Sequence, residues 1–195
     1  MVALAREQLL TVPPPFHFRD LVFAHGWLHL DPYLWDEETE TLTRAEQLPT
    51  GEVVHLSLSS HPEGVLLRTD APADALPELV RRARWMLALD EEFAPFHALC
   101  RQHPGLAAVG ERGQGRILRC PTVWEDLVKT LFSVNTTWGQ TVAMTRNLVQ
   151  SYGRGDELEC RAFPAPADVA RVEPAELQSV CRVGYRAEPL SQLAR

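Results

Sequence analysis

Few side chains in this 195-residue sequence form a group that could carry out catalysis. Lys129 is the only lysine, so an amine nucleophile would have to be this side chain or the N-terminus. The four cysteines contain no C-x-x-C pair, which argues against a zinc or iron–sulfur site. We therefore expect neither a metal ion nor a cofactor.

Two further groups of reactive side chains have simple structural interpretations. His97, Cys100 and His103 recur every three residues and would lie on roughly one face of a helix. Three half-buried helix residues are a better interpretation of this spacing than a metal site. The glutamates of segment 37–40 alternate with threonine, which is typical of an exposed hairpin and not of paired catalytic carboxylates.

The most informative stretch is a polar break, TLFSVNTTWGQTV, at residues 130–142. Apolar residues lead into it, an Asn-Thr-Thr-Trp-Gly sequence interrupts them, and a second run follows. Asn135 could be an ordinary turn residue between two helices, or it could project from the loop into a binding partner. For Trp138, packing inside the protein is favoured over contact with a partner.

The composition indicates a soluble globular protein with one large domain or two small ones. Hydrophobic residues make up 45% of the sequence, and no run approaches the length of a membrane span. We expect a cytoplasmic protein without a membrane partner. The net charge of −7 argues mildly against nucleic acid as a partner. Between residues 81 and 120, however, seven arginines stand against four acids, so a locally basic face is compatible with the sequence.

The first seventy residues predict an antiparallel β-sheet. In EVVHLSLSS (52–60), Val54, Leu56 and Leu58 alternate with polar residues, which is typical of a half-buried strand. GVLLRT (64–69) follows as its hairpin partner. We predict two more strands, LVFAHGWLHL (21–30) and YLWDEETETLTR (33–44).

From about residue 73 the apolar spacing becomes helical. Thr122 and Glu125 form a capping-box pattern, which predicts that a helix begins there and that Glu125 reaches back to the Thr122 amide. Segment 107–121 is predicted as a loop and segment 154–161 as a polar link. The predicted helices lie at about 73–87, 91–103, from 122, 141–152, 165–171, 173–180 and from 189.

These elements predict an α+β fold, with an N-terminal antiparallel sheet domain followed by an all-helical domain. We place the sheet domain at 1–72, connecting helices and a Gly/Arg loop at 73–120, and the start of the helical domain at 121–195. The last helix has no capping residue and runs to Arg195. We therefore expect either a fragment or a final helix that packs against something else.

The helical part resembles a known family. CPTVWEDLVKTLFSVNTTWGQTVAMTRNLVQSYG (120–153) and FPAPADVARVEPAELQSVCRVGYRAEPL (163–190) resemble the first half of a helix-hairpin-helix (HhH-GPD) DNA glycosylase domain. The order of the preceding parts also matches. The family has an antiparallel sheet domain, then a helix pair, then a loop with Gly-Arg and Leu-Arg before a Pro. Here these parts are FRDLVFAHGWLHL, LDEEFAPFHALC and GRILRCP. The 8-oxoguanine DNA glycosylase branch is the most similar, with 3-methyladenine DNA glycosylase II as a cousin. The resemblance implies a monomeric, nucleoid-associated base-excision repair enzyme of prokaryotic type, whose partner is double-stranded DNA with a damaged base.

The resemblance also implies roles for individual residues. Such enzymes flip a damaged base out of the duplex and fill the gap. Asn135 stands where the family has an Asn near the orphaned base, and an amide offers donors and an acceptor to a base edge. Tyr185 would wedge between base pairs, replacing stacking worth roughly 1–3 kcal/mol per base, and Arg186 would address the orphaned base. A solvated turn is the alternative for these two. Gln140 stands where the 8-oxoguanine branch has an Arg, which weakens any expected preference for an opposite cytosine.

Further carried-over residues lie earlier in the chain. Arg116 and Arg119 are candidates for phosphate contacts, with ordinary solvated arginines as the alternative. Gly26 falls where the family has a backbone carbonyl that faces the lesion base. Lys129 lies on the wrong helix for a nucleophile and is expected at the surface or facing phosphate.

No catalytic residue of the family can be carried onto this sequence. The helix-hairpin-helix, the catalytic Asp and any catalytic Lys are expected after Arg195. The complete enzyme would hydrolyse the N-glycosidic bond of an oxidised or alkylated purine, and these residues alone would not cleave. The alternatives are a non-catalytic DNA-binding module and a helical protein-interaction domain unrelated to DNA.

Overall fold

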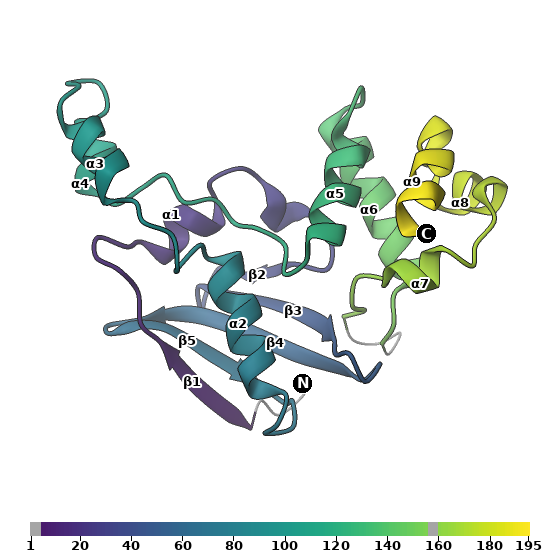
Figure 1. Ribbon diagram of the computed structural model, residues 1–195, viewed down its shortest axis with the longest axis horizontal. Coiled ribbons are helices and arrows are strands. Elements are labelled where there is room, and N and C mark those ends of the chain that lie inside the picture. Colours follow the sequence, from purple (N-terminus) through teal and green to yellow (C-terminus); the bar gives the residue numbers. More distant parts are fainter. Residues whose placement is uncertain (1–4, 156–159) are drawn as a thin grey trace. The chain divides into compact units, whose positions relative to one another are not determined.

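The computed structural model describes residues 5–155 and 160–195 (Figure 1). Five strands form an antiparallel sheet in the order β1-β5-β4-β3-β2. These strands are β1 (Arg6–Leu10), β2 (Leu34–Asp36), β3 (Thr41–Gln47), β4 (Val53–His61) and β5 (Gly64–Thr69). The alternation of segment 52–60 correctly predicts β4, in which Val54, Leu56 and Leu58 are buried.

Helices make up most of the remaining described chain, which confirms the α+β fold class. The α-helices are α1 (Phe18–Val22), α2 (Leu76–Met86), α3 (Ala94–Arg101), α4 (Ala107–Glu111), α5 (Val123–Ser133), α6 (Trp138–Tyr152), α7 (Pro166–Val169), α8 (Pro174–Cys181) and α9 (Ala187–Ala194). Two 3₁₀ turns are η1 (Trp27–His29) and η2 (Gly184–Arg186). Within the described ranges, no helix has the length and apolar character needed to cross a bilayer. The predicted polar link at 154–161 lies partly outside the described residues.

The described chain divides into two compact units, each made of discontinuous segments. Unit 1 contains the described residues up to Leu28 together with Trp35–Leu42 and Ser57–Pro121. Unit 2 contains His29–Leu34, Thr43–Leu56 and Thr122–Arg195.

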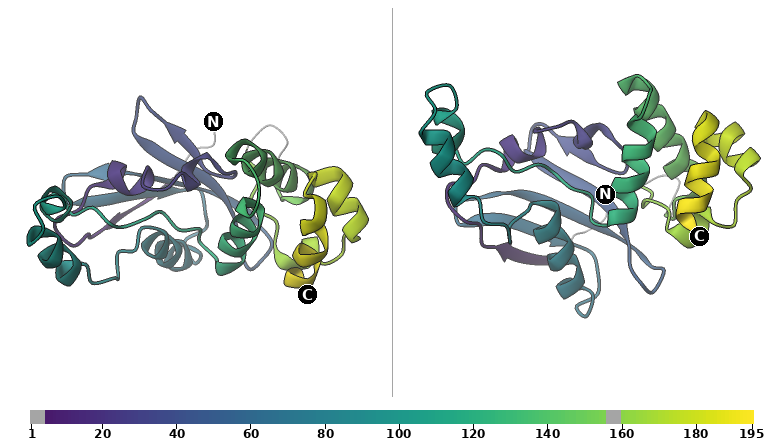
Figure 2. Two further views of the ribbon diagram at one scale, coloured as in Figure 1. Left: turned by 90° about the horizontal axis from the view of Figure 1, so that it is seen from above. Right: turned by 45° about the horizontal axis from the view of Figure 1, so that its top comes forward.

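Unit 1 combines sheet and helices. β1 pairs antiparallel with β5, with Arg6 opposite Thr69 and Leu10 opposite Val65. α2 contacts β1 and lies across this part of the sheet in Figure 1. α3 and α4 pack side by side as a helical hairpin, and both views of Figure 2 show them together.

Two strand predictions near the N-terminus are wrong. Segment 21–30, predicted as a strand, contains the end of α1 and the turn η1. Phe18, Leu21 and Val22 are buried at helical spacing, and the φ of 87° at Gly26 turns the chain where a strand would continue. Segment 33–44, predicted as one strand, contains β2, a turn and the start of β3.

The loop predicted at 107–121 is also wrong in part, because it contains α4. Gly110 lies inside this helix, and a Cβ atom at that position would come within 2.6 Å of the His97 carbonyl oxygen. The glycine that suggested a loop is therefore required by the close approach of α3 and α4, and not by a turn.

Unit 2 holds the helices α5 to α9 around one hydrophobic core. α5 and α6 are neighbours joined by a short turn, and α8 and α9 lie beside them (Figure 2). The core residues are Val128, Phe132, Met144, Leu148, Val149, Phe163, Val169, Leu177, Cys181, Val183, Ala187, Leu190 and Ala194. This packing fixes the turn between α5 and α6, where the sequence places its polar break.

Candidate nucleic-acid interface

α5 begins where the sequence predicts and ends just before Asn135. The hydroxyl of Thr122 accepts a hydrogen bond from the Glu125 amide at 3.3 Å, which caps the N-terminus of the helix. Val134 already has an extended backbone, with ψ of 130°. The last carbonyl groups of α5 therefore need hydrogen-bond donors from outside the helix.

Asn135 turns the chain from α5 toward α6. Its φ of 48° lies in the left-handed region, which Asn tolerates better than most residues. Its side chain is exposed, and the amide makes no hydrogen bond with the part of the chain that the structure describes. Turn geometry thus explains the choice of residue, while the exposed amide keeps its donors and acceptor available.

Arg186 supplies the donors that the end of α5 lacks. Its Nε donates to the Leu131 carbonyl at 3.2 Å, and its Nη2 donates to the carbonyls of Val134 and of Asn135, the latter at 3.3 Å. Its Nη1 donates to the Val183 carbonyl at 3.4 Å. The side chain is only 6% exposed, and a cation at a helix C-terminus is favoured by the helix dipole. Arg186 therefore holds the turn in place.

Tyr185 lies beside this buried cation and is itself 62% exposed. Its ring centre is 4.6 Å from the guanidinium carbon of Arg186, within range of a cation–π contact. Gly184 begins the turn with a φ of 58°. Because one guanidinium contacts both the Tyr185 ring and the Asn135 carbonyl, the structure brings together these three residues that the sequence singled out.

A capping box that the sequence analysis missed orders the start of α6. The Thr137 hydroxyl accepts from the Gln140 amide at 3.4 Å, and Oε1 of Gln140 accepts from the Thr137 amide at 3.1 Å. Oε1 also accepts from the Thr136 hydroxyl at 2.7 Å. α6 therefore begins at Trp138, before the predicted start at Thr141. The Thr-x-x-Gln spacing is the signal that could have revealed this cap.

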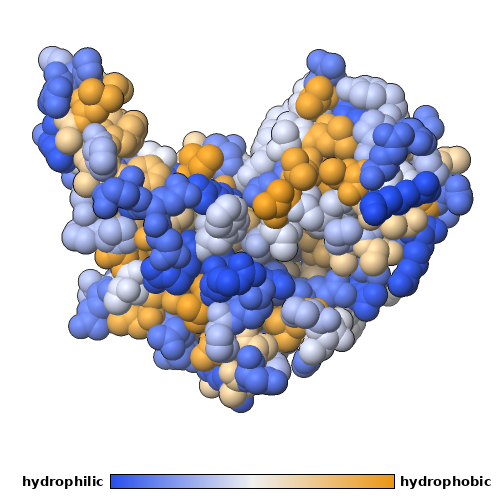
Figure 3. Space-filling view, viewed as in Figure 1, coloured by the Kyte–Doolittle hydropathy of each residue, from blue (hydrophilic) through white to orange (hydrophobic). Residues whose placement is uncertain are grey.

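An apolar stripe on α5 leads to this turn. Val123 and Leu127 are exposed on one face of α5, and Val134, just past the end of the helix, is exposed as well. Figure 3 shows apolar atoms following α5 in the upper right of the view. Exposed apolar groups in a row mark a surface that can bind another surface. Apolar side chains and the free amide of Asn135 therefore adjoin at this end of α5.

The buried face of α5 instead carries charges, Glu125 and Lys129, which form a quartet with Arg44 and Glu46 of strand β3. Arg44 donates to the two carboxylate oxygens of Glu125 at 3.1 and 2.7 Å, and its Nε lies 2.6 Å from Glu46. Lys129 donates to Glu125 at 2.7 Å and to the Leu30 carbonyl at 3.3 Å. The four side chains are each less than 4% exposed. Two positive and two negative charges thus compensate one another inside unit 2.

The quartet corrects two predictions about α5. Lys129 was expected at the surface or facing phosphate, but it is fully buried, with Nζ 4.8 Å from the centre of the Tyr33 ring. Glu125 does not complete the predicted capping box, because its carboxylate binds Arg44 and Lys129. Burial alone would raise the pKa of Glu125, but these two positive charges outweigh it and lower that pKa to about 2.

The predicted arginines of unit 1 are also engaged within the protein. Arg116 is 4% exposed, and it donates to the carbonyls of Ala88 and Glu91 at 3.3 and 3.4 Å. Its guanidinium carbon lies 4.2 Å from the centre of the Phe93 ring. Arg119 forms an ion pair with the Glu91 carboxylate, and its side chain is 24% exposed. Arg119 therefore keeps more access to solvent than Arg116.

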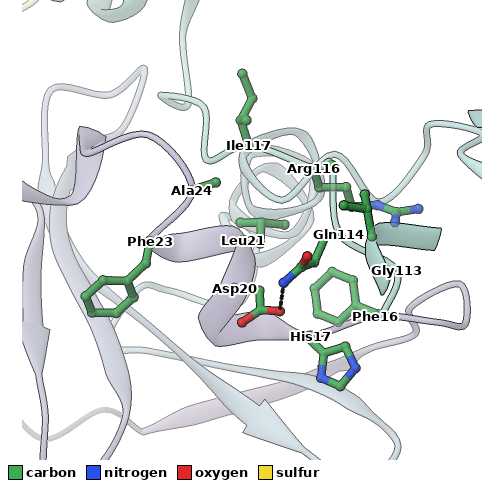
Figure 4. Close-up of a pocket in the computed structure, with 12 residues that line it drawn as sticks. Phe16, His17, Asp20, Leu21, Phe23, Ala24, Gly113, Gln114, Arg116 and Ile117 are labelled. Carbon is green, nitrogen blue, oxygen red and sulfur yellow. Dashed lines mark hydrogen bonds between the residues drawn. The ribbon is translucent and has the colours of Figure 1, made fainter. Parts of the chain in front are cut away.

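A cavity of about 460 Å³ lies in unit 1 between α1 and the loop that carries Arg116. Figure 4 shows Gln114 and Asp20 pointing toward each other across it, and Nε2 of Gln114 donates to the Asp20 carboxylate at 2.7 Å. Phe16 and His17 complete this part of the wall. Asp20 is thus one half of a hydrogen-bonded pair and not a free base.

A metal ion would need His, Cys, Asp or Glu residues at a suitable spacing. Within 5–155 and 160–195, no cluster of three or more His, Cys, Asp or Glu residues is arranged to hold an ion. His97, one of the three residues with this helical spacing, is buried with Nε2 2.8 Å from the Gln114 carbonyl oxygen.

Gly26, the predicted pocket residue, lies in unit 1 with a positive φ of 87°.

Comparisons with known sequences give no match. The sequence fits no model of a protein family, and no curated protein matches it.

Comparisons with solved structures show the fold. The 3-methyladenine DNA-glycosylase from Archaeoglobus fulgidus is 15% identical, with a TM-score of 0.74 over 97% of this chain and 66% of that chain. The 8-oxoguanine glycosylase/lyase of Clostridium acetobutylicum, in complex with double-stranded DNA containing cytosine opposite to 8-oxoG, is 17% identical, with a TM-score of 0.66 over 92% and 58%. MBOgg1, in complex with a low-affinity DNA ligand, is 20% identical, with a TM-score of 0.67 over 92% and 58%. This chain therefore has a DNA glycosylase fold and spans less than two thirds of the length of these proteins.

Proposed function

We propose that this chain is the DNA-engaging part of a base-excision repair glycosylase of the helix-hairpin-helix type. The substrate class would be double-stranded DNA carrying an oxidised or alkylated purine. The shared fold of the 8-oxoguanine and 3-methyladenine DNA glycosylases supports this proposal. The observation that carries it is the turn in unit 2, where Asn135 and Tyr185 are both exposed and are tied to one buried guanidinium.

The geometry suggests how the turn would work. Flipping a base out of a duplex removes its stacking and its pairing, at a cost of a few kcal/mol. The exposed ring of Tyr185 would replace lost stacking, and the Asn135 amide would offer hydrogen bonds to the bases at the gap. Arg186 holds the backbone of Asn135 and contacts the Tyr185 ring before DNA arrives, so the backbone of the turn needs little ordering on binding.

Cleavage of the glycosidic bond is assigned to residues outside this sequence. Lys129 is fully buried, and its Nζ is bound to Glu125 and to the Leu30 carbonyl, so it is not available as a nucleophile. We propose that an Asp, with a Lys in a glycosylase/lyase, follows Arg195 in the complete enzyme. The lesion-facing role of Gly26 and a phosphate contact of Arg119 also belong to this proposal.

The proposal is tested by measuring the affinity of residues 1–195 for a duplex with a single tetrahydrofuran abasic site and for the same duplex intact. We expect at least about tenfold tighter binding to the abasic duplex, and an affinity that falls between about 50 and about 200 mM salt. Equal affinity for both duplexes would favour a protein-interaction domain. Robust base excision by these residues alone would overturn the assignment of catalysis to a later part of the chain.

A further inference from the structure

We propose that, on this turn, Asn135 alone contacts the base opposite the vacated position, and that this contact accepts all four bases equally. The inference rests on the proposed function and specifies the substrate: a duplex with a vacated position, whatever the partner base. It follows from which polar groups near the turn are already bonded and which are free.

Arg186 has almost no capacity left for a base. A guanidinium has five N–H groups, and four of them in Arg186 donate to backbone carbonyls of the turn and of Val183. Turning this side chain toward DNA would leave the carbonyls at the end of α5 without donors inside the protein. Arg186 is therefore a positioning residue for the turn.

Gln140 is committed in a similar way. Its Oε1 accepts hydrogen bonds from the Thr137 amide and from the hydroxyls of Thr136 and Thr137, so its acceptor is saturated. Release of this side chain would open the capping box that begins α6. Gln140 thus shapes the turn and does not offer a base a donor–acceptor pair.

Of the three side chains compared, only Asn135 has a free donor–acceptor pair, and the chemistry of its amide sets the specificity. Each base carries one donor beside one acceptor on its Watson–Crick edge: N6–H and N1 in adenine, N4–H and N3 in cytosine, N1–H and O6 in guanine, and N3–H and O4 in thymine. The Asn amide also carries a donor beside an acceptor, and rotation about its last bond exchanges the two. One exposed amide can therefore complement every base.

A free guanidinium would behave differently. It carries donors only, so it favours a base edge with adjacent acceptors, such as N3 and O2 of cytosine. Because Arg186 faces the protein interior, its guanidinium does not supply this discrimination. The arrangement suits an enzyme that responds to a vacated position and not to the identity of the orphaned base.

The test measures fluorescence anisotropy of the chain with four duplexes that carry one tetrahydrofuran site opposite A, C, G or T. We expect the four dissociation constants to agree within about threefold, below the roughly 5- to 100-fold discrimination of a good bidentate base contact. Asn135→Ala should weaken binding to all four by a similar factor. Gln178→Ala, an exposed amide on α8, is the matched control and should change nothing.

Arg186→Lys separates positioning from base reading. Lysine keeps the charge but not the fork, so binding to all four duplexes should weaken together and the ranking should not change. A preference above about tenfold for one opposite base, or a loss confined to one base in this variant, would overturn the inference. If Arg186→Lys does not fold, as judged by circular dichroism, the wild-type ranking and Asn135→Ala still decide. No preference for any abasic duplex over the intact one would instead overturn the proposed function, and the inference with it.

Discussion

The two ends of α5 use polar residues in opposite ways. Within the helix, Glu125 is a buried carboxylate that binds both Arg44 and the buried Lys129. After its end, the charge of Arg186 is again buried, but the exposed groups are the uncharged side chains of Asn135 and Tyr185. In and around this helix, the charged side chains are therefore buried and support the fold, while the exposed groups are neutral.

This difference bears on which side chains could contact DNA if the proposed function holds. Arginines and lysines are the obvious candidates for DNA contacts. The sequence offered Arg116 and Arg186 as such candidates, and it placed Lys129 at the surface or facing phosphate. Each is more than nine-tenths buried and bonded to the protein. With a net charge of −7, binding would then depend on how well the turn fits a vacated position and less on phosphate neutralisation.

The largest effect is expected in the buried quartet of α5 and β3. Lys129→Met should lower the free energy of unfolding by about 3–5 kcal/mol, because it removes one positive charge from the buried quartet and leaves a net negative charge on Arg44, Glu46 and Glu125. Urea titration followed by tryptophan fluorescence measures this change. Arg171→Met removes an exposed charge of the same unit and should cost less than about 0.5 kcal/mol. Equal stability of the two variants would show that the quartet does not support unit 2.

A smaller change in the free energy of unfolding is expected when the pH is lowered, because Glu125 of the same quartet becomes protonated. The folded-state pKa of Glu125 is about 2, below the roughly 4.3 of an unfolded Glu. Its contribution to stability is therefore complete above about pH 4.3 and is lost as the pH falls toward 2. The difference in unfolding free energy between wild type and Glu125→Gln should shrink over this range in urea titrations. A difference that stays constant from neutral pH down to the acid limit would contradict the proposed pairing.

The smallest effect concerns the conformation of the turn. Asn135→Ala places a less tolerant residue at a φ of 48° and should lower the free energy of unfolding by about 1 kcal/mol. Asn135→Gly should change it by less than about 0.5 kcal/mol, because glycine adopts this conformation freely. Both variants lose the amide, so both should lose the same affinity for abasic DNA. If Asn135→Ala, the less stable variant, instead loses more affinity than Asn135→Gly, then the turn contributes to binding only through its backbone shape.

The fold was predictable where local pattern and tertiary role agree. β4 follows from strict alternation, and the start of α5 follows from the Thr122 cap. Segment 21–30 could not be assigned in this way, because an apolar run this short fits a strand or a helical turn equally well. β1 is missing from the sequence-based prediction, since five residues become a strand only through pairing with β5.

For the candidate site, the sequence indicated which residues lie together but not how their side chains are oriented. The resemblance pointed to Asn135, Tyr185 and Arg186, and the structure places them together. A sequence does not show which acceptors a guanidinium will find, so the inward orientation of Arg186 was not foreseeable. Lys129 carried a local signal, because Glu125 stands four residues before it, the spacing of a helical ion pair.

The central claim is that the uncharged side chains of Asn135 and Tyr185 fill a vacated position in DNA. Its most direct test is the affinity of Tyr185→Ala for a duplex with one abasic site. Loss of a stacking ring should weaken this binding by about 5- to 100-fold and leave binding to intact duplex unchanged. Leu106→Ala, which removes an exposed apolar side chain in unit 1, should bind like wild type. A folded Tyr185→Ala variant that binds the abasic duplex as tightly as wild type would contradict the account.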